Sequence, residues 1–131
     1  MNVNNSYLPA LMMLAALSLP ESAFAAQGWG TANVTSILTT TQAQTSPATG
    51  LVYGGCMANL SVNVNQLAGS PNCPTTWVTF GCDGTYATQS SAQMLLDQAQ
   101  LAHIANKPVF IVVDDTMLIN GICTAIRVDV N

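Results

Sequence analysis

The spacing of apolar and polar positions changes period along the C-terminal half of the chain, and this change predicts its secondary structure. Residues 76–82 and 109–113 are short apolar runs rich in branched and aromatic side chains, which favour strands. The run 109–113 is unbroken, as in a strand covered on both faces. Residues 90–107 carry alanine and leucine at helical spacing, and Pro108 stops this helix. Residues 123–130 alternate again and close the chain as a strand.

The N-terminal half predicts two more strands. Residues 31–41 alternate loosely and form the first. The second comprises residues 51–53 and 56–64, with a glycine pair between them that indicates a bulge or bend. The turn signal Asn120-Gly121 joins the last two strands as a hairpin. In the final strand, strict alternation predicts one shared face for Ile122, Thr124, Ile126, Val128 and Val130.

The predicted helix has an unusually wide apolar side. Ser90 or Ser91 can cap its first turn. Its apolar and small residues spread over about 220° of the circumference, whereas a surface helix needs a stripe only a little over ~100° wide. We therefore expect one side to cover the sheet and another to meet a neighbouring subunit. The residues expected at that subunit interface are Met94, Gln98, Leu101 and Ala105.

The first residues read as a secretory signal peptide. Residues 8–19 form an apolar run that is too short to span a bilayer. Ala23 and Ala25 place small residues where a signal peptidase reads them. We expect cleavage after Ala25, with cleavage after Ala26 as the alternative. Residues 1–25 would then be the signal peptide and residues 26–131 one secreted or periplasmic domain without a membrane span.

Four cysteines in an exported chain predict two disulfides. The favoured pairing is Cys56–Cys73 and Cys82–Cys123, because the first two lie in one predicted hairpin and the last two at neighbouring strand ends. Zinc is not expected, since no Cys-x-x-Cys spacing exists.

Few groups in the chain could carry chemistry. Two basic and six acidic residues give a formal net charge of −4, and without a basic patch we expect no nucleic-acid partner. His103 is the one histidine, and no nucleophile-elbow sequence accompanies it, so we expect no catalytic site. Asp114 and Asp115 end the predicted strand and supply too few oxygens for calcium. We expect neither a metal nor a cofactor.

Three strands, a helix and a two-strand hairpin form the element order of the OB-fold, a mainly β five-stranded barrel with one helix. Over residues 77–130 the chain also resembles the B subunits of bacterial AB5 toxins, nearest to the subtilase cytotoxin B-subunit type. The matching features are Cys82 at a strand end, the alanine-rich helix 91–102, its exit 106–109, the turn 120–123 and the strand segment 126–128.

The resemblance implies a secreted, glycan-binding subunit that forms a homo-oligomer, a pentamer in that family, and delivers an enzymatic A subunit. Helices would line a central pore. The composition leaves other functions open: a small exported structural or envelope protein, or a protein-binding partner without a sugar ligand.

Sugar sites stack an aromatic ring on the sugar and surround it with polar groups. Candidate ligand-binding residues are Trp29, Tyr53, Asp83 and Tyr86. Trp29 stands between two glycines and is expected to be exposed, whereas Trp77 lies mid-strand and is expected in the core or at an interface.

Overall fold

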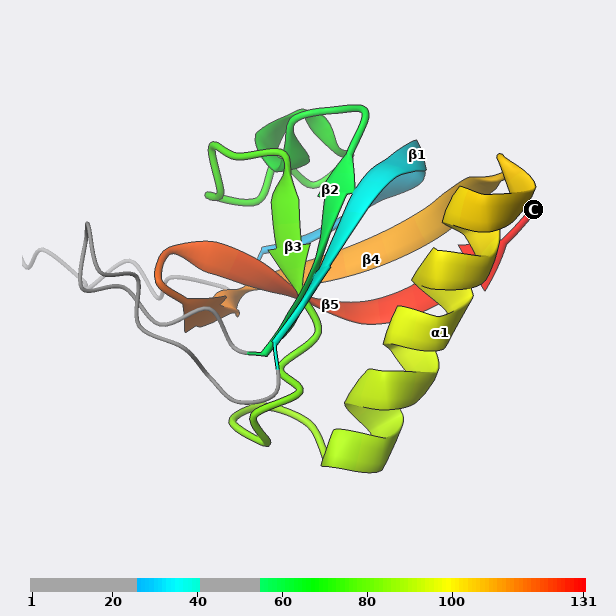
Figure 1. Ribbon diagram of the computed structural model, residues 1–131. Helices are drawn as coiled ribbons and strands as arrows, with labels where there is room; N and C mark the ends of the chain where they lie inside the picture. Colours follow the sequence, from blue (N-terminus) through cyan, green and yellow to red (C-terminus); the bar gives the residue numbers. More distant parts are fainter. Residues whose placement is uncertain (1–25, 41–54) are drawn as a thin grey trace, which may run out of the picture.

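The computed structural model describes residues 26–40 and 55–131, and these form a closed five-stranded barrel with one helix. The mainly β class and the position of the helix between the third and fourth strands are confirmed (Figure 1). The elements are β1 (Gln27–Thr39), β2 (Cys56–Leu60), the 3-10 turn η1 (Val64–Gln66), β3 (Trp77–Thr79), α1 (Gln89–Ala105), β4 (Pro108–Ile119) and β5 (Ile122–Val130).

The barrel closes in the strand order β1-β2-β3-β5-β4, with β4 pairing back to β1. The long strand β1 serves two partners: residues 27–33 pair with β4, and residues 34–39 pair with β2. All neighbours are antiparallel except β3 and β5, which run parallel and meet through the single pair Thr79 and Thr124. The predicted hairpin of the last two strands is confirmed.

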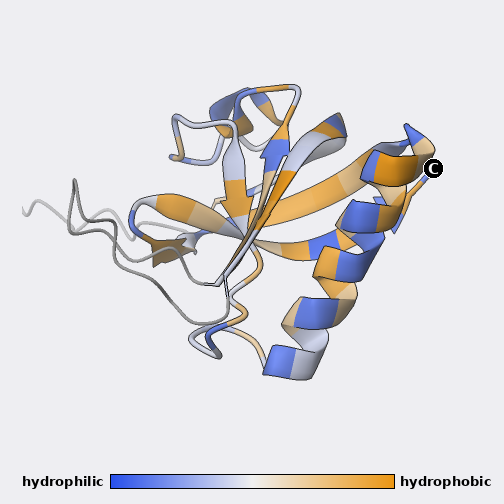
Figure 2. Ribbon diagram, viewed as in Figure 1, coloured by the Kyte–Doolittle hydropathy of each residue, from blue (hydrophilic) through white to orange (hydrophobic). Residues whose placement is uncertain are grey.

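The core fills the barrel and continues under the helix. Phe80, Val78, Leu60 and Ile111 are buried among the inward-facing residues of the strands. Helix α1 adds a buried side made mostly of alanine, which allows its backbone to approach β1 and β5 closely. Figure 2 shows β4 apolar along most of its length and apolar residues on successive turns of α1. The buried helix residues are Ala92, Leu96, Ala99 and Ala102.

The helix begins one residue earlier than predicted, at Gln89, and ends two residues earlier, at Ala105. Thr88, not Ser90 or Ser91, is the N-cap: its Oγ1 accepts from the Ser91 amide at 3.2 Å. A threonine hydroxyl can satisfy an orphan helix amide in the same way as a serine hydroxyl, and Thr88 stands one residue before the helix begins. Asn106 ends the helix in the left-handed conformation, with φ 52°.

Strand β4 is longer than predicted and is not covered on both faces. It continues through Asp114 and Asp115 instead of ending there, because hydrogen bonds satisfy both carboxylates. On its outer face Phe110 and Val112 remain half-buried in the single chain. An unbroken run of apolar residues does not by itself show whether both faces of a strand are covered or one face is still in contact with solvent.

The prediction that one face of the last strand is shared along its whole length is wrong, because β5 contains a bulge. Val112 pairs with Arg127 and Val113 pairs with Ala125, so Ile126 is an extra residue on β5. The bulge reverses the alternation: Cys123 and Ala125 point inward before it, and Val128 points inward after it. Ile126 therefore does not share the face of Val128, and it is 38% exposed.

The second and third strands are shorter than predicted. Strand β2 ends at Leu60, because Asn63 starts the turn η1: its side chain accepts from the Asn65 amide, and the Gln66 side chain accepts from the Asn63 amide. A turn with polar side chains at every second position imitates strand alternation. The predicted strand segment 51–53 lies outside the described residues.

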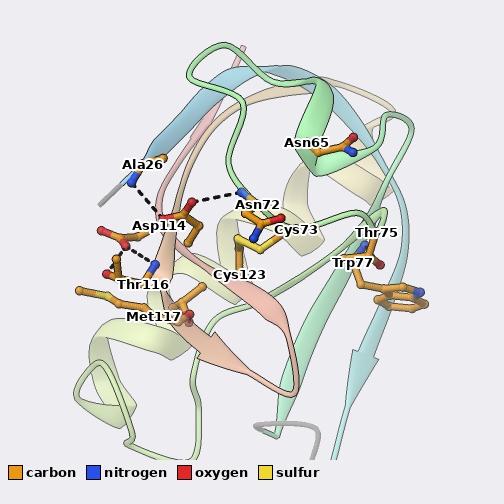
Figure 3. Close-up of a disulfide and its surroundings, with 12 residues drawn as sticks. Ala26, Asn65, Asn72, Cys73, Thr75, Trp77, Asp114, Thr116, Met117 and Cys123 are labelled. Carbon is orange, nitrogen blue, oxygen red and sulfur yellow. Dashed lines mark hydrogen bonds between the residues drawn. A yellow bond between two sulfur atoms is a disulfide. The ribbon is translucent and has the colours of Figure 1, made fainter. Parts of the chain in front are cut away.

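The two disulfides are Cys56–Cys82 and Cys73–Cys123, so the predicted pairing is wrong. The register of β2 against β3 brings Cys56 opposite Phe80, whose amide donates to the Cys56 carbonyl at 3.1 Å, and thus close to Cys82. The loop between β2 and β3 leaves the ladder and carries Cys73 across to β5. The second disulfide therefore joins that loop to β5, the strand that meets β3 only through Thr79 and Thr124 (Figure 3).

Candidate functional site

The outer face of β1 carries a largely exposed tryptophan among neutral polar side chains. Alternation along β1 turns Gln27, Trp29 and Thr31 outward, while Gly28 and Ala32 face the core. Trp29 is 47% exposed, as predicted. The flanking amide and hydroxyl groups can donate and accept hydrogen bonds. The Trp29 ring can stack on an apolar face of a ligand, and the polar side chains beside it can form hydrogen bonds with hydroxyl groups of the same ligand.

The loop after η1 lies against Trp29. The Trp29 amide donates to the Ala68 carbonyl at 2.9 Å, and the Ala68 amide donates back at 3.0 Å. The next residue is Gly69, at φ 83°, where an added Cβ would lie 3.0 Å from the Trp29 Cζ3 atom and 2.1 Å from the Gln27 carbonyl oxygen. Only glycine fits here, so the backbone of the loop can pack close to the ring.

A second group of outward side chains continues from Trp29 across the sheet. Trp29 pairs with Val112, which pairs with Arg127 on β5, and Phe110 pairs with Asp129 in the next row. Arg127 lies over the Phe110 ring, 5.6 Å from its centroid, and its Nη2 is 2.6 Å from Asp129 Oδ2. Sequence reasoning missed this group. Phe110, Arg127 and Asp129 come to lie on the same face as Trp29 only through the pairing register of β1, β4 and β5.

The remaining predicted sugar contacts do not join Trp29. Tyr86 is 40% exposed, but its hydroxyl donates to the Leu118 carbonyl at 3.0 Å, at the far end of β4. Leu118 stands six residues beyond Val112, a strand distance of about 20 Å. The Asp83 carboxylate accepts from the amide and hydroxyl of Thr85 within a local turn. Tyr53 lies outside the described residues.

Trp77 lines an apolar groove of about 310 Å³ on the outside of the barrel. Its side chain is half-buried, and Figure 3 shows the indole pointing away from the Cys73–Cys123 disulfide. The groove has few polar groups to orient a ligand. The other lining residues are Leu38, Met57 and Ile122.

The carboxylates of Asp114 and Asp115 are occupied by donors of the protein itself. Asp114 accepts from the Thr116 hydroxyl at 2.6 Å and from the Thr116 amide at 2.9 Å. Asp115 accepts from the backbone amides of Ala26 and Asn72 (Figure 3). Within residues 26–40 and 55–131, no group of three or more His, Cys, Asp or Glu residues is arranged to hold a metal ion.

The hydrogen bonds of Thr116 set the protonation of Asp114. The Thr116 side chain has the largest effect and lowers the pKa of the Asp114 carboxyl, and the Thr116 amide and Gln27 side chain act in the same direction. Burial opposes them by raising the pKa, but the net shift is downward. The buried carboxylate is therefore held in its charged form.

The predicted interface residues share an exposed side of α1. Met94 is 69% exposed and Leu101 is 53% exposed, and Gln98 and Ala105 are exposed beside them. A groove of about 370 Å³ runs between this side and β5, and Val128 forms its floor. His103 turns the other way, with Nδ1 2.8 Å from the Val34 carbonyl oxygen. We call Met94, Gln98, Leu101 and Ala105 the outer helix face.

Comparison with protein-family models, curated proteins and solved structures found no match to this chain. The likeness to toxin B subunits therefore stays a prediction. In the described part of the chain, no helix has both the length and the apolarity needed to cross a membrane. The two disulfides indicate an oxidising, non-cytosolic environment.

Proposed function

We propose that this protein is an exported, oligomeric binding subunit with an OB-fold, which recognises glycans through the indole of Trp29. The strand order β1-β2-β3-β5-β4 with a helix after β3 supports the OB-fold assignment. The exposed Trp29 ring, packed beside Gly69, is the observation that carries the sugar site.

The surroundings of Trp29 suit a sugar better than an apolar or ionic ligand. Gln27 and Thr31 flank the ring with neutral hydrogen-bonding groups, and each lies two residues away on the same face. One N–H of the Gln27 side chain donates to Asp114 Oδ2 at 3.4 Å, so its second N–H and its oxygen are the groups offered to a ligand. Arg127 stands two strands away, or about 10 Å at the usual spacing between strands. This distance accommodates a second sugar ring, which would meet Phe110 and the Arg127–Asp129 pair.

The outer helix face supports assembly. Two large apolar side chains, Met94 and Leu101, remain mostly exposed on a helix whose other side already covers the barrel. Burying them against identical subunits would stabilise a ring. The resemblance to AB5 toxins gives a pentamer as the expected size and an enzymatic A subunit as the expected partner.

Glycan-array binding by the purified, disulfide-bonded protein tests the sugar site. We expect the Trp29→Ala variant to bind at least tenfold more weakly, because tenfold corresponds to about 1.4 kcal/mol and the substitution removes the stacking ring. Tyr86→Ala is the matched control, since it removes an exposed aromatic far from Trp29 and should bind normally. Unchanged binding by Trp29→Ala, or no binding by the native protein, would refute the site.

A second function has its own support: an exported structural or envelope protein, or a partner of another protein, with no sugar ligand. The exposed apolar residues Met94, Leu101 and Ile104 favour it, because such side chains suit protein contacts more than sugar contacts. Assembly without glycan binding would select this function.

A further inference from the structure

The first residue of the described domain is bound by an acidic side chain. The Ala26 nitrogen donates to Asp115 Oδ1 at 2.9 Å, and the Asp115 amide donates to the Ala26 carbonyl at 3.3 Å. The other oxygen of the same carboxylate, Oδ2, accepts from the Asn72 amide at 3.1 Å. Figure 3 labels the two donor residues, Ala26 and Asn72, and dashed lines mark hydrogen bonds from both. The carboxylate is thus oriented toward the Ala26 nitrogen.

Packing fixes the start of β1 beside that carboxylate. A Cβ on Gly28 would lie 2.4 Å from the Cγ atom of Pro71, so the strand and the loop are in direct contact. The loop is joined covalently to β5 through Cys73–Cys123. The acceptor and the Ala26 nitrogen therefore meet without any rearrangement of either segment.

In the part of the chain that the structure describes, neither Asp114 nor Asp115 has a cationic partner. Asp114 accepts from Thr116 and Gln27, which are neutral, and Asp115 accepts from two backbone amides. In residues 26–40 and 55–131 the recorded salt bridge joins Arg127 and Asp129, not Asp114 or Asp115. A positive charge at the Ala26 nitrogen would be favourable, because ionised donors form hydrogen bonds roughly twice as strong as neutral ones.

We propose that cleavage after Ala25 turns the Ala26 nitrogen into an α-ammonium group that Asp115 holds as an ion pair. Hydrolysis of the Ala25–Ala26 peptide bond consumes one water molecule and leaves a carboxylate on Ala25 and an amine on Ala26. This amine takes up a proton below about pH 8. The mature end then forms a charge-assisted hydrogen bond where the uncut chain offers only a neutral amide. The inference rests on the export that the proposed function includes, and not on its sugar site.

The position of Asp115 distinguishes the two cleavage sites. Cleavage after Ala25 places the new charge 2.9 Å from the carboxylate. Cleavage after Ala26 would remove the residue that Asp115 binds, and the carboxylate would lose this partner. The structure thus favours Ala26 as the first residue of the mature protein.

The test uses the full chain, expressed with export, in a Lys107→Arg background. Lys107 is the only lysine, so the α-amine is then the only amine that an acetylating reagent can modify. Intact mass of the purified protein identifies the first residue. Acetylation keeps an N–H donor on Ala26 but removes its charge, which reproduces the uncut amide. The Tm before and after acetylation is compared with the same pair of measurements in the Asp115→Asn variant.

We expect a mature mass that begins at Ala26 and a fall in Tm of about 4–8 °C on acetylation, which should be absent in Asp115→Asn. The α-amine should also react severalfold more slowly in the parent than in Asp115→Asn, because the carboxylate keeps it protonated. Asp97→Asn, which removes a carboxylate from the helix, should behave like the parent. A retained leader, a first residue other than Ala26, or equal Tm shifts with and without Asp115 would overturn the proposal. Loss of glycan binding alone would leave it standing.

Discussion

Gly69 lies so close to the indole of Trp29, the most exposed aromatic ring of the described chain, that a Cβ at position 69 would come 3.0 Å from the Cζ3 atom. We expect Gly69→Ala to destabilise the fold by about 2 kcal/mol, because φ is 83° and the new Cβ would meet the Gln27 carbonyl. Chemical denaturation measures this loss, and glycan binding should fall with it.

Gly84→Ala is the control for Gly69→Ala. Gly84 has φ 89° but nothing within 4 Å of its added Cβ, so only the backbone cost of about 1 kcal/mol applies. Binding should be normal. Equal losses of stability in both variants would show that the contact with Trp29 and Gln27 is unimportant.

The lowered pKa of Asp114 predicts that the folded protein loses stability in acid. Its folded pKa is lowered, chiefly by the Thr116 side chain, so the unfolded chain, with a carboxyl pKa of about 3.9, takes up the proton first as the pH falls. The contribution is complete above the unfolded pKa and is lost as the pH falls through the folded value. A Tm profile from pH 7 to pH 2 should therefore fall more steeply below about pH 4 in the native protein than in Asp114→Asn. Thr116→Val should lie between them, and identical profiles would contradict this assignment.

The disulfides should differ slightly in strength. Cys73–Cys123 closes a sequence separation of 50 residues and Cys56–Cys82 one of 26. In the chain-entropy account, replacing each pair by alanine costs about 4 kcal/mol for the longer loop and about 3.5 kcal/mol for the shorter. Urea unfolding measures the difference. Peptide mapping without reduction checks which cysteines are paired. A disulfide-linked peptide that contains Cys56 and Cys73 would contradict the pairing Cys56–Cys82 and Cys73–Cys123.

The outer helix face predicts the effect of a charge on assembly. Leu101→Lys should convert the oligomer to a monomer, because a buried unpaired ammonium is costly at an interface. The Tm of that monomer should change little, since Leu101 is already 53% exposed. Light scattering coupled to size exclusion measures the mass. Gln93→Lys adds the same charge on another side of the helix and should leave the oligomer intact. A native protein that is monomeric at micromolar concentration would remove the interface.

Most of the fold was predictable from local patterns. The helix, to within two residues at either end, its stop before Pro108 and the Asn120-Gly121 turn depend on neighbouring residues, and the sequence displays these directly. The bulge at Ile126 and the disulfide partners depend on register between distant strands. Alternation in one strand contains no information about where its neighbour slips by a residue.

The candidate site was predicted only in part. Exposure of Trp29 followed from the glycines on either side of it. Phe110 and Arg127 reach the same face only because β4 lies between β1 and β5, a fact of topology. Tyr86 illustrates the opposite case, because an aromatic residue in a polar turn looked available but its hydroxyl binds the Leu118 carbonyl.

The seam between β3 and β5 has a consequence for where this protein can exist. One residue pair, Thr79 and Thr124, joins the two strands. Of the two disulfides only Cys73–Cys123 reaches across this seam, from the loop before β3 to the residue next to Thr124, because Cys56–Cys82 joins β2 to the end of β3. Under thiol-reducing conditions this covalent link is lost, and strands that separated there would present two free edges, which invite other chains to add to them.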